Sequence, residues 1–198
     1  LAAVNVTTGP GGVNALNGVY GAYVDSIGMI VISGQVKRET MVSSYNLPLR
    51  QLGDQEVDIV AMAKPVCKMA VVLRDPADVR YVVEKALWLA THGRPGPVWI
   101  DVPIDVQATP IKPETLRGFD PVTEGNATAL PSEANPATGD ALEKLAKQLL
   151  ERLAKAERPA ILAGAGVRIS GAHDAFLRVI DKLGIPVTSG WNAYDNLW

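Results

Sequence analysis

A glycine-rich stretch near the start of the chain, TTGPGGVN at residues 7–14, is the first place where residue types and spacing point to chemistry. Gly9, Gly11 and Gly12 remove side chains where a strand passes into a helix, so a ligand can approach the backbone and its unpaired N–H groups. The pattern therefore favours a site for a polar or anionic ligand. A turn of this composition is also ordinary in α/β proteins, and both interpretations stay open at this point.

A second glycine turn, AGAGV at residues 163–167, follows an apolar run and is the kind of sequence that grips a dinucleotide. Its fingerprint is incomplete, because Gly164, Gly166 and Gly171 give the spacing G-x-G-x-x-x-x-G and no acidic residue ends a second strand at the required distance. A dinucleotide-binding module is therefore an alternative function without the full motif.

The composition excludes several classes of partner. The chain has 198 residues, with 19 basic and 21 acidic side chains and a formal net charge of −2, so neither nucleic acid nor an anionic membrane is an expected partner. No apolar run is long enough to span a bilayer. The single cysteine, Cys67, excludes an internal disulfide, favours a reducing, cytoplasmic location, and is expected to be a small core residue.

Alternating apolar runs and helical periods predict the elements that position these turns. Residues 40–53 lack a clean period and are expected to form a loop, whereas the continuous apolar strand 29–33 is expected to be covered on both faces. The repeated β–α–β order predicts a parallel sheet with helices on both sides. In chain order we expect strands at 4–7, 29–33, 67–73 and 98–103, and helices at 13–25, 57–62 and 76–91.

The stretch 103–136 breaks this pattern, because it is rich in proline and lacks an apolar period over a length unusual for a loop. We interpret it as an interdomain linker. Beyond it a second α/β unit begins, with an expected helix from about residue 138 to Lys155, a strand entering the turn at 163–167, a helix ended by Gly184, and a further strand.

Five segments of the chain, in order, resemble the thiamine diphosphate enzymes similar to acetolactate synthase: TTGPGGVN, VISGQV, RPGPVWIDVPIDVQ, RPAILAGAGV and LGIPVTSGWNA. The resemblance covers essentially the whole chain. It implies an α/β fold of parallel-sheet, three-layer domains, both incomplete in this chain. Residues 1–102 would be the C-terminal part of the pyrimidine-binding domain, 103–136 the proline-rich linker, and 137–198 the N-terminal part of the central domain.

The same resemblance names a ligand for the first turn. In enzymes of this family a TTGPG-type turn approaches the aminopyrimidine ring of the cofactor, so the residues implied to bind it are Gly9, Pro10, Gly11 and Asn14. Asn14 offers an amide that donates and accepts hydrogen bonds, but it can equally cap the helix, and the two roles stay open.

Further contacts are implied for a substrate and for a second cofactor. The positions that would face a substrate are Gln35, Gln55 and Lys68. In relatives that contain FAD, the equivalents of Arg94, Gly164 and Gly166 contact the flavin, although many relatives keep such residues without FAD.

Departures from acetolactate synthase fall at substrate-facing positions. Asp54 stands where those enzymes have Phe, Glu39 stands in place of an Arg, and Ile104 stands in place of a Lys. These changes argue against a strict acetolactate synthase, because an apolar-to-charged change alters any pocket that the residue lines. The identity of the substrate within the class used by this family, the 2-keto acids, therefore stays open.

The resemblance implies that the intact protein is an enzyme that uses thiamine diphosphate and Mg²⁺ to decarboxylate or join 2-keto acids, as a homodimer or homotetramer. The family's activating glutamate would lie upstream of Leu1 and its metal-binding motif is absent, so no catalytic residue and no metal ligand is expected in this segment. The segment alone is expected to be inactive. The alternatives are a non-catalytic pseudo-enzyme that keeps the fold, and a dinucleotide-binding module.

Overall fold

The computed structural model describes residues 1–128 and 138–197. The chain divides into two compact units, Leu1–Glu133 and Ala134–Trp198. Among the described residues, no helix is both long enough and apolar enough to cross a membrane.

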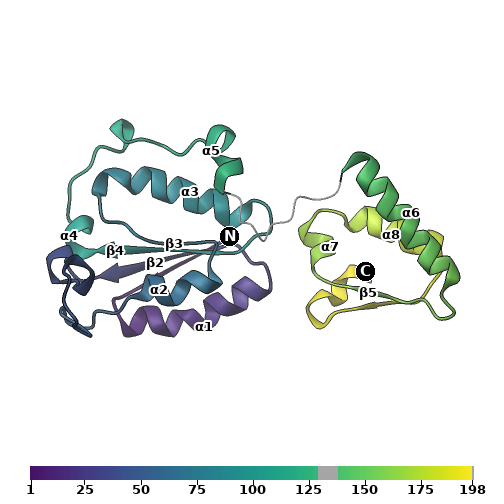
Figure 1. Ribbon diagram of the computed structural model, residues 1–198, viewed down its shortest axis with the longest axis horizontal. Coiled ribbons are helices and arrows are strands. Elements are labelled where there is room, and N and C mark those ends of the chain that lie inside the picture. Colours follow the sequence, from purple (N-terminus) through teal and green to yellow (C-terminus); the bar gives the residue numbers. More distant parts are fainter. Residues whose placement is uncertain (129–137, 198) are drawn as a thin grey trace. The chain divides into compact units, whose positions relative to one another are not determined.

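A parallel sheet forms the centre of the first unit (Figure 1). The register aligns Val31 with Val4 on one side and with Trp99 on the other, and each pair of neighbouring strands is parallel. This arrangement confirms the predicted parallel α/β fold. The strands are β1 (Ala2–Val6), β2 (Met29–Gln35), β3 (Met69–Val72) and β4 (Pro97–Pro103), in the spatial order β1-β2-β4-β3.

Helices cover both faces of this sheet and make a three-layer unit (Figure 1). Helices α1 (Pro10–Val24) and α2 (Ile59–Ala63) lie on one face, and α3 (Val79–Thr91) lies on the other. Side chains alternate between the faces as the pleat requires, because Val31 packs with residues of α1 and α2 while Ile30 packs with residues of α3. At Ile30 and Val31 the apolar run of β2 is therefore buried on both sides, as its sequence predicts, whereas Ile32 is 38% exposed.

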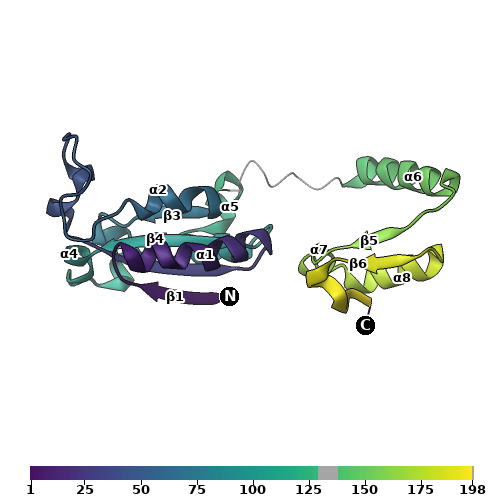
Figure 2. The same ribbon diagram turned by 90° about the horizontal axis from the view of Figure 1, so that it is seen from below.

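The segment between β2 and α2 is mostly irregular and projects from the body of the unit (Figure 2). It contains the short 3-10 turns η1 (Arg38–Thr40) and η2 (Val42–Ser44), in agreement with the loop predicted for residues 40–53. Two further 3-10 turns flank β3 and its connection to α3, namely η3 (Lys64–Val66) and η4 (Pro76–Asp78).

Local capping explains where the helices near the glycine turn begin. Helix α1 has Pro10 at its start, with Gly9 as the N-cap residue and no side-chain cap. Asn14 is therefore not the cap of α1, which corrects one of the two roles that its sequence position leaves open. Helix α2 has Asp58 as its N-cap residue, and the Asp58 carboxylate accepts a hydrogen bond of 2.9 Å from the N–H of Ala61.

The proline-rich stretch after β4 packs on the first unit in its described part. Its elements are α4 (Ile104–Gln107), the 3-10 turn η5 (Pro113–Thr115) and α5 (Pro121–Thr128). The ring of Phe119 is 9% exposed, and its centroid lies 5.8 Å from that of Tyr81 and 5.7 Å from that of Trp88, both on α3. The backbone N–H of Phe119 also donates to the Glu84 carboxylate at 2.7 Å.

These contacts place the described part of the stretch with the first unit, although the sequence pattern favours a linker there. The first unit runs to Glu133, whereas the sequence pattern places a domain end at residue 102 and a linker at 103–136. The prolines remove any apolar period, yet the ring of Phe119 and its backbone N–H both contact α3. Residues 129–137 of the expected linker lie outside the described residues.

The second unit contains a two-stranded parallel sheet, β5 (Ile161–Ala163) paired with β6 (Val187–Ser189). Gly184 follows the last helix with φ of 59°, the left-handed conformation expected of a glycine at a helix end. The predicted order of helix, strand, glycine turn, helix and strand is therefore confirmed. The remaining elements are α6 (Gly139–Lys155), α7 (Gly166–Ile169), α8 (His173–Leu183) and the 3-10 turns η6 (Trp191–Leu197).

Candidate functional site

The turn between β1 and α1 lies directly against another part of the chain. Gly9 has φ 60° and ψ −111°, a combination that glycine adopts readily and other residues do not. A Cβ atom at this position would lie 2.2 Å from the carbonyl oxygen of Gln55, far inside van der Waals contact. Glycine is therefore required here both by conformation and by space.

The next two glycines of the motif serve packing. A Cβ atom at Gly11 would lie 2.8 Å from Cγ2 of Thr7, and a Cβ atom at Gly12 would lie 2.9 Å from Cγ1 of Ile59. Because Ile59 is the first residue of α2, the missing side chain at Gly12 lets α1 approach α2 closely. The three glycines thus have different reasons for lacking a side chain.

The residues 53–58, called the wall segment, lie opposite the turn. Gln55 has φ 58°, a left-handed conformation that is uncommon for a residue other than glycine. Glu56 stabilises this backbone, because its carboxylate accepts hydrogen bonds from three N–H groups and such charge-assisted bonds are strong. The donors are Val42 at 2.7 Å, Leu52 at 3.1 Å and Gly53 at 3.2 Å.

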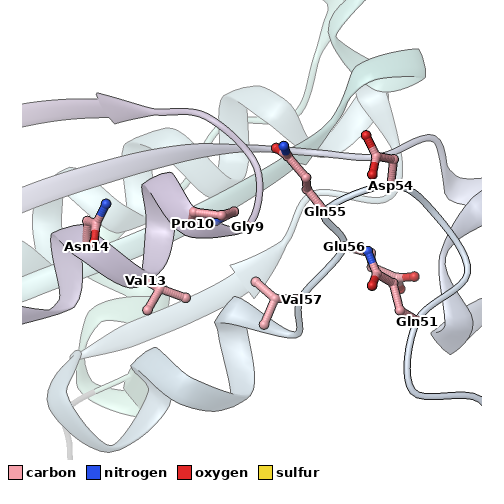
Figure 3. A pocket seen from close by; sticks show the side chains of 9 residues that line it. All are labelled: Gly9, Pro10, Val13, Asn14, Gln51, Asp54, Gln55, Glu56 and Val57. Atoms are coloured by element: carbon pink, nitrogen blue, oxygen red, sulfur yellow. The ribbon is translucent and has the colours of Figure 1, made fainter.

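An open hollow of about 530 Å³ lies between the turn and the wall segment (Figure 3). It is located after the carboxyl end of β1 and at the start of α1, the edge of a parallel sheet at which α/β proteins bind ligands. Gln55 lies beside Gly9, and Asn14 follows Pro10 along α1 (Figure 3). The lining residues are Gly9, Pro10, Val13, Asn14, Gln51, Asp54, Gln55, Glu56 and Val57.

The lining suits an uncharged polar ligand better than a phosphate. No Lys or Arg belongs to it, and its acidic side chains are Asp54 and Glu56. Because Glu56 is bonded to backbone N–H groups, the exposed Asp54 is the carboxylate left toward solvent. The amides of Asn14 and Gln55 can donate and accept hydrogen bonds, and Val13 adds apolar surface for a flat ring.

Gln35, which the resemblance places toward a substrate, lies in the interior and does not line the hollow. It ends β2 and is 3% exposed. Its Nε2 donates to Oδ2 of Asp101 at 2.9 Å and to the carbonyl oxygen of Val57 at 3.0 Å, and its Oε1 accepts from the N–H of Val36 at 3.0 Å. Both ends of this amide are therefore engaged within the protein.

Lys68 lies at the opposite end of the sheet from the hollow. It precedes the first residue of β3 and is 8% exposed. Its Nζ donates to the carbonyl oxygens of His92 at 2.6 Å and Arg94 at 2.8 Å, in the loop that follows α3. The structure thus separates Lys68 from Gln55, although the resemblance implies that both face a substrate.

The residues implied to contact a flavin belong to different units. Arg94, in the first unit, donates from Nε to Oγ of Ser26 at 2.7 Å. Gly164 and Gly166 lie in the second unit, at the end of β5 and the start of α7. Of the residues implied to bind a cofactor or a substrate, the structure brings to one hollow Gly9, Pro10, Asn14 and Gln55, with Gly11 behind them in α1.

A buried carboxylate behind the wall segment was not indicated by any motif. Asp101 is 1% exposed, and its Oδ1 accepts from the hydroxyl of Ser33 at 2.5 Å, while Oγ of Ser33 accepts from the indole N–H of Trp99 at 2.8 Å. Burial raises the pKa of Asp101 to about 6, and the hydrogen bonds from Ser33 and Gln35 act against that rise. The available signal was an acidic residue inside the apolar strand VWIDVP.

The single cysteine, Cys67, lies in the interior of the first unit. Cys67 is buried, which raises the pKa of its thiol to about 12 and agrees with the predicted core position. Within residues 1–128 and 138–197, no group of three or more His, Cys, Asp or Glu side chains is arranged to hold a metal ion.

Family models match two parts of the chain. Residues 1–62 match the N-terminal TPP-binding domain of thiamine pyrophosphate enzymes, and residues 146–197 match the central domain of thiamine pyrophosphate enzymes. Thiamine pyrophosphate is another name for thiamine diphosphate. All the residues that line the hollow fall within the first of these matches.

Curated relatives align with almost the whole chain. The acetolactate synthase isozyme 3 large subunit of Escherichia coli (strain K12) is 32% identical over 194 residues, 94% of this chain. The acetolactate synthase large subunit of Lactococcus lactis subsp. lactis is 35% identical over 189 residues, 96% of this chain. The probable acetolactate synthase large subunit of Methanocaldococcus jannaschii is 33% identical over 192 residues, 91% of this chain. The chain spans 30%, 30% and 28% of the length of these relatives, respectively.

Proposed function

This chain belongs to the family of thiamine pyrophosphate enzymes similar to acetolactate synthase, and we propose on that premise that the whole protein binds thiamine pyrophosphate and acts on 2-keto acids. The observation that carries the proposal is the hollow at the Gly9 turn, because its whole lining lies in the part of the chain matched to a TPP-binding domain. A glycine-shaped turn, three side-chain amides and a small apolar surface meet there.

The residues of this hollow fit the aminopyrimidine end of the cofactor. That ring is flat and carries an amino group and ring nitrogens, which pair with groups that donate and accept hydrogen bonds. Backbone groups of the turn are accessible because Gly9 has no side chain, and the Asn14 amide lies one helical turn further on. Since no Lys or Arg lines the hollow, the diphosphate and its Mg²⁺ would be bound by residues outside this lining.

The contribution of this chain would be to bind and orient. When bound, thiamine pyrophosphate supplies an electron sink for the carbanion that a 2-keto acid forms as it loses carbon dioxide. Asn14 and Gln55 would fix the ring, Glu56 would hold the wall segment in place through its three backbone hydrogen bonds, and Val13 would shield the ring from water. The product would be released as an aldehyde or joined to a second carbonyl compound.

The substrate that we propose is a 2-keto acid. Asp54 places an exposed carboxylate in the lining, and a negative charge there disfavours anionic groups nearby. A homodimeric or homotetrameric assembly and a cytoplasmic location are part of the same proposal, which follows from the family alone.

The test is turnover by the full-length protein with added thiamine pyrophosphate and Mg²⁺. Release of carbon dioxide from a panel of 2-keto acids, with chain lengths from pyruvate upward, is the expected result. Calorimetric titration of the cofactor on the same sample separates two failures. Cofactor binding without carbon dioxide from any acid would favour the pseudo-enzyme, and absence of binding would remove the function proposed for the hollow.

A further inference from the structure

The amide of Gln35 joins the interior of the first unit to the wall segment. Its Nε2 lies 2.9 Å from Oδ2 of Asp101 and 3.0 Å from the carbonyl oxygen of Val57. Val57 belongs to the wall segment and lines the hollow. A buried side chain at the end of β2 therefore carries a hydrogen bond directly to the backbone of the loop that would face a ligand.

The groups behind Gln35 fix the direction of its amide. An ionised carboxylate accepts hydrogen bonds and cannot donate them, so the NH₂ end of Gln35 must face Asp101. The other oxygen of Asp101 accepts from Ser33 at 2.5 Å, and the Gln35 oxygen accepts from the N–H of Val36 at 3.0 Å. A flip of the amide would turn its oxygen toward the Asp101 carboxylate and the Val57 carbonyl, both of which repel it.

The wall segment needs support from both of its ends. The backbone of Gln55 is held at φ 58°, and a left-handed conformation of this kind costs free energy unless the surroundings maintain it. The carboxylate of Glu56 ties the segment to the N–H of Val42 at 2.7 Å on one side. On the other side, Gln35 ties Val57 to the sheet.

We propose that Gln35 is a positioning residue for the hollow and acts on the wall segment through Val57. Its amide, oriented by Asp101, keeps the backbone of Gln55 against the Gly9 turn. This role differs from the substrate contact that the resemblance implies for Gln35. It rests on the proposed function only for the identity of the ligand, thiamine pyrophosphate, because the contacts themselves are made within the protein.

The first test measures hydrogen exchange of the unliganded full-length protein. Gln35→Met removes both donors at nearly constant volume, and exchange at residues 53–59 is expected to become about tenfold faster, as for the loss of one or two hydrogen bonds. Gln107→Met is the matched control, because Gln107 also donates from its amide to a backbone carbonyl, that of Val102, at 2.7 Å. The control is expected to leave residues 53–59 unchanged.

The second test uses charge at the same position. Gln35→Glu places a carboxyl group against the Asp101 carboxylate, and two carboxylates at hydrogen-bond distance must share one proton. Asp58 is the further charged residue that acts on the Asp101 carboxyl, and its negative charge adds to the conflict. The rate ratio of variant to wild type at residues 53–59 is expected to be largest at about pH 7.5 and to fall at about pH 5.5, where the shared proton relieves the repulsion between the two carboxyl groups. It should stay above one, because a single shared proton leaves the carbonyl oxygen of Val57 without a donor.

A rescue completes this second test. Adding Asp101→Asn to Gln35→Glu supplies an amide donor to the new carboxylate, so the pH dependence of the rate ratio is expected to disappear. A general loss of packing would not be relieved by acid or by the second substitution. Each Gln35 variant should bind thiamine pyrophosphate about tenfold more weakly at every pH at which residues 53–59 exchange fast. The control Gln107→Met should bind it as the wild type does.

Two results would overturn the positioning role. One is equal exchange at residues 53–59 in Gln35→Met and Gln107→Met. The other is faster exchange spread evenly over the first unit, including α3, in both Gln35→Met and Gln35→Glu at all pH values, which would make Gln35 a core residue only. If the wild-type protein does not bind thiamine pyrophosphate, the proposed function fails, while the exchange experiment still decides the role of Gln35.

Discussion

The two glycine turns of this protein both follow a short parallel strand, yet the surrounding chain treats their missing side chains differently. A Cβ atom at Gly9 would lie 2.2 Å from the Gln55 carbonyl oxygen, whereas a Cβ atom at Gly164 or Gly166 would have no neighbour within 4 Å among the described residues. The first turn is fixed by contact with the wall segment, and the second faces open space. Glycine spacing therefore identifies a turn without telling whether packing demands the glycine.

The buried polar side chains beneath the two turns differ in the same way. In the first unit a carboxyl group, Asp101, is connected through Gln35 to the wall segment. In the second unit the buried polar group is a neutral amide. Asn196 is 0% exposed, and its Nδ2 donates to the carbonyl oxygen of Gly164 at 2.9 Å. Oδ1 of Asn196 has no hydrogen-bond partner among the described residues. The carboxyl group of Asp101 in the first unit can therefore gain or lose a proton, whereas the amide of Asn196 in the second unit cannot.

Gly9→Ala is the single substitution expected to change the stability of the protein most, and it tests the contrast between the two turns. The new side chain must adopt a conformation reserved for glycine and displace the Gln55 backbone, and together these should lower the free energy of unfolding by about 4 kcal/mol. Urea titration of the full-length protein measures the change. The matched control is Gly18→Ala, also in α1, where a Cβ atom meets nothing within 4 Å. Equal stability of the two variants would break the contrast between constrained and open glycines.

The next effect is a pH dependence confined to the first unit. Asp101 has a folded-state pKa of about 6 against an ordinary value of 3.8, so the folded protein binds this proton more tightly than the unfolded chain. Its stabilising contribution is fully present below about pH 4 and is lost as the pH rises through about 6, by about 3 kcal/mol in total. Asp101→Asn should lack this loss.

The measurement is the difference in the free energy of unfolding between wild type and Asp101→Asn at each pH. Acidification from about pH 7 to about pH 4 should stabilise the wild type relative to the variant, because carboxyl groups common to both proteins cancel in the difference. Parallel pH profiles would show that Asp101 titrates in the folded protein as it does in water.

A smaller effect is expected at Asn14, on binding and not on stability. Since Asn14 lines the hollow and does not cap α1, Asn14→Ala should weaken thiamine pyrophosphate binding by about 1 kcal/mol, the value of one net hydrogen bond. The melting temperature should stay that of the wild type. Calorimetric titration and a thermal melt of the full-length protein test the two statements, and a lowered melting temperature with unchanged affinity would reverse them.

The smallest effect is expected in the second turn. Gly166 begins α7 with open space around a Cβ atom, so Gly166→Ala should be neutral or should stabilise the second unit by about 0.5 kcal/mol through reduced freedom of the unfolded chain. Hydrogen exchange of α7 in the full-length protein reports this change. A marked loss of protection would mean that the second turn is constrained like the first.

The order of elements was predictable because each buried strand is a continuous apolar run and each helix has a matching period. The family resemblance implies Gly9, Pro10 and Asn14 for the cofactor and Gln55 for a substrate, and the structure lines one hollow with all four. The attachment of the segment around Phe119 was not, because one aromatic ring among prolines leaves no period.

The sequence did not indicate in which direction the side chains of Gln35 and Lys68 turn. Gln35 and Lys68 each flank a strand, and residue type does not tell whether a side chain at a strand end turns toward the interior or toward a ligand. Gln35 turns inward because Asp101 offers an acceptor on the neighbouring strand. Lys68 stands at the amino end of β3 and bonds the loop after α3, away from the hollow.

The order of strands in the sheet has a consequence for how this protein folds during its synthesis on the ribosome. β4 lies between β2 and β3 although it is made after both, and Asp101 is separated from Gln35 by 66 positions along the chain. A nascent chain that has emerged only as far as β3 holds the Gly9 turn, the wall segment and Gln35, but not β4, which carries Asp101. Contacts of such long sequence separation form slowly and leave unpaired strand edges exposed meanwhile. The edge of β2 that β4 later occupies is therefore exposed during the interval before β4 inserts.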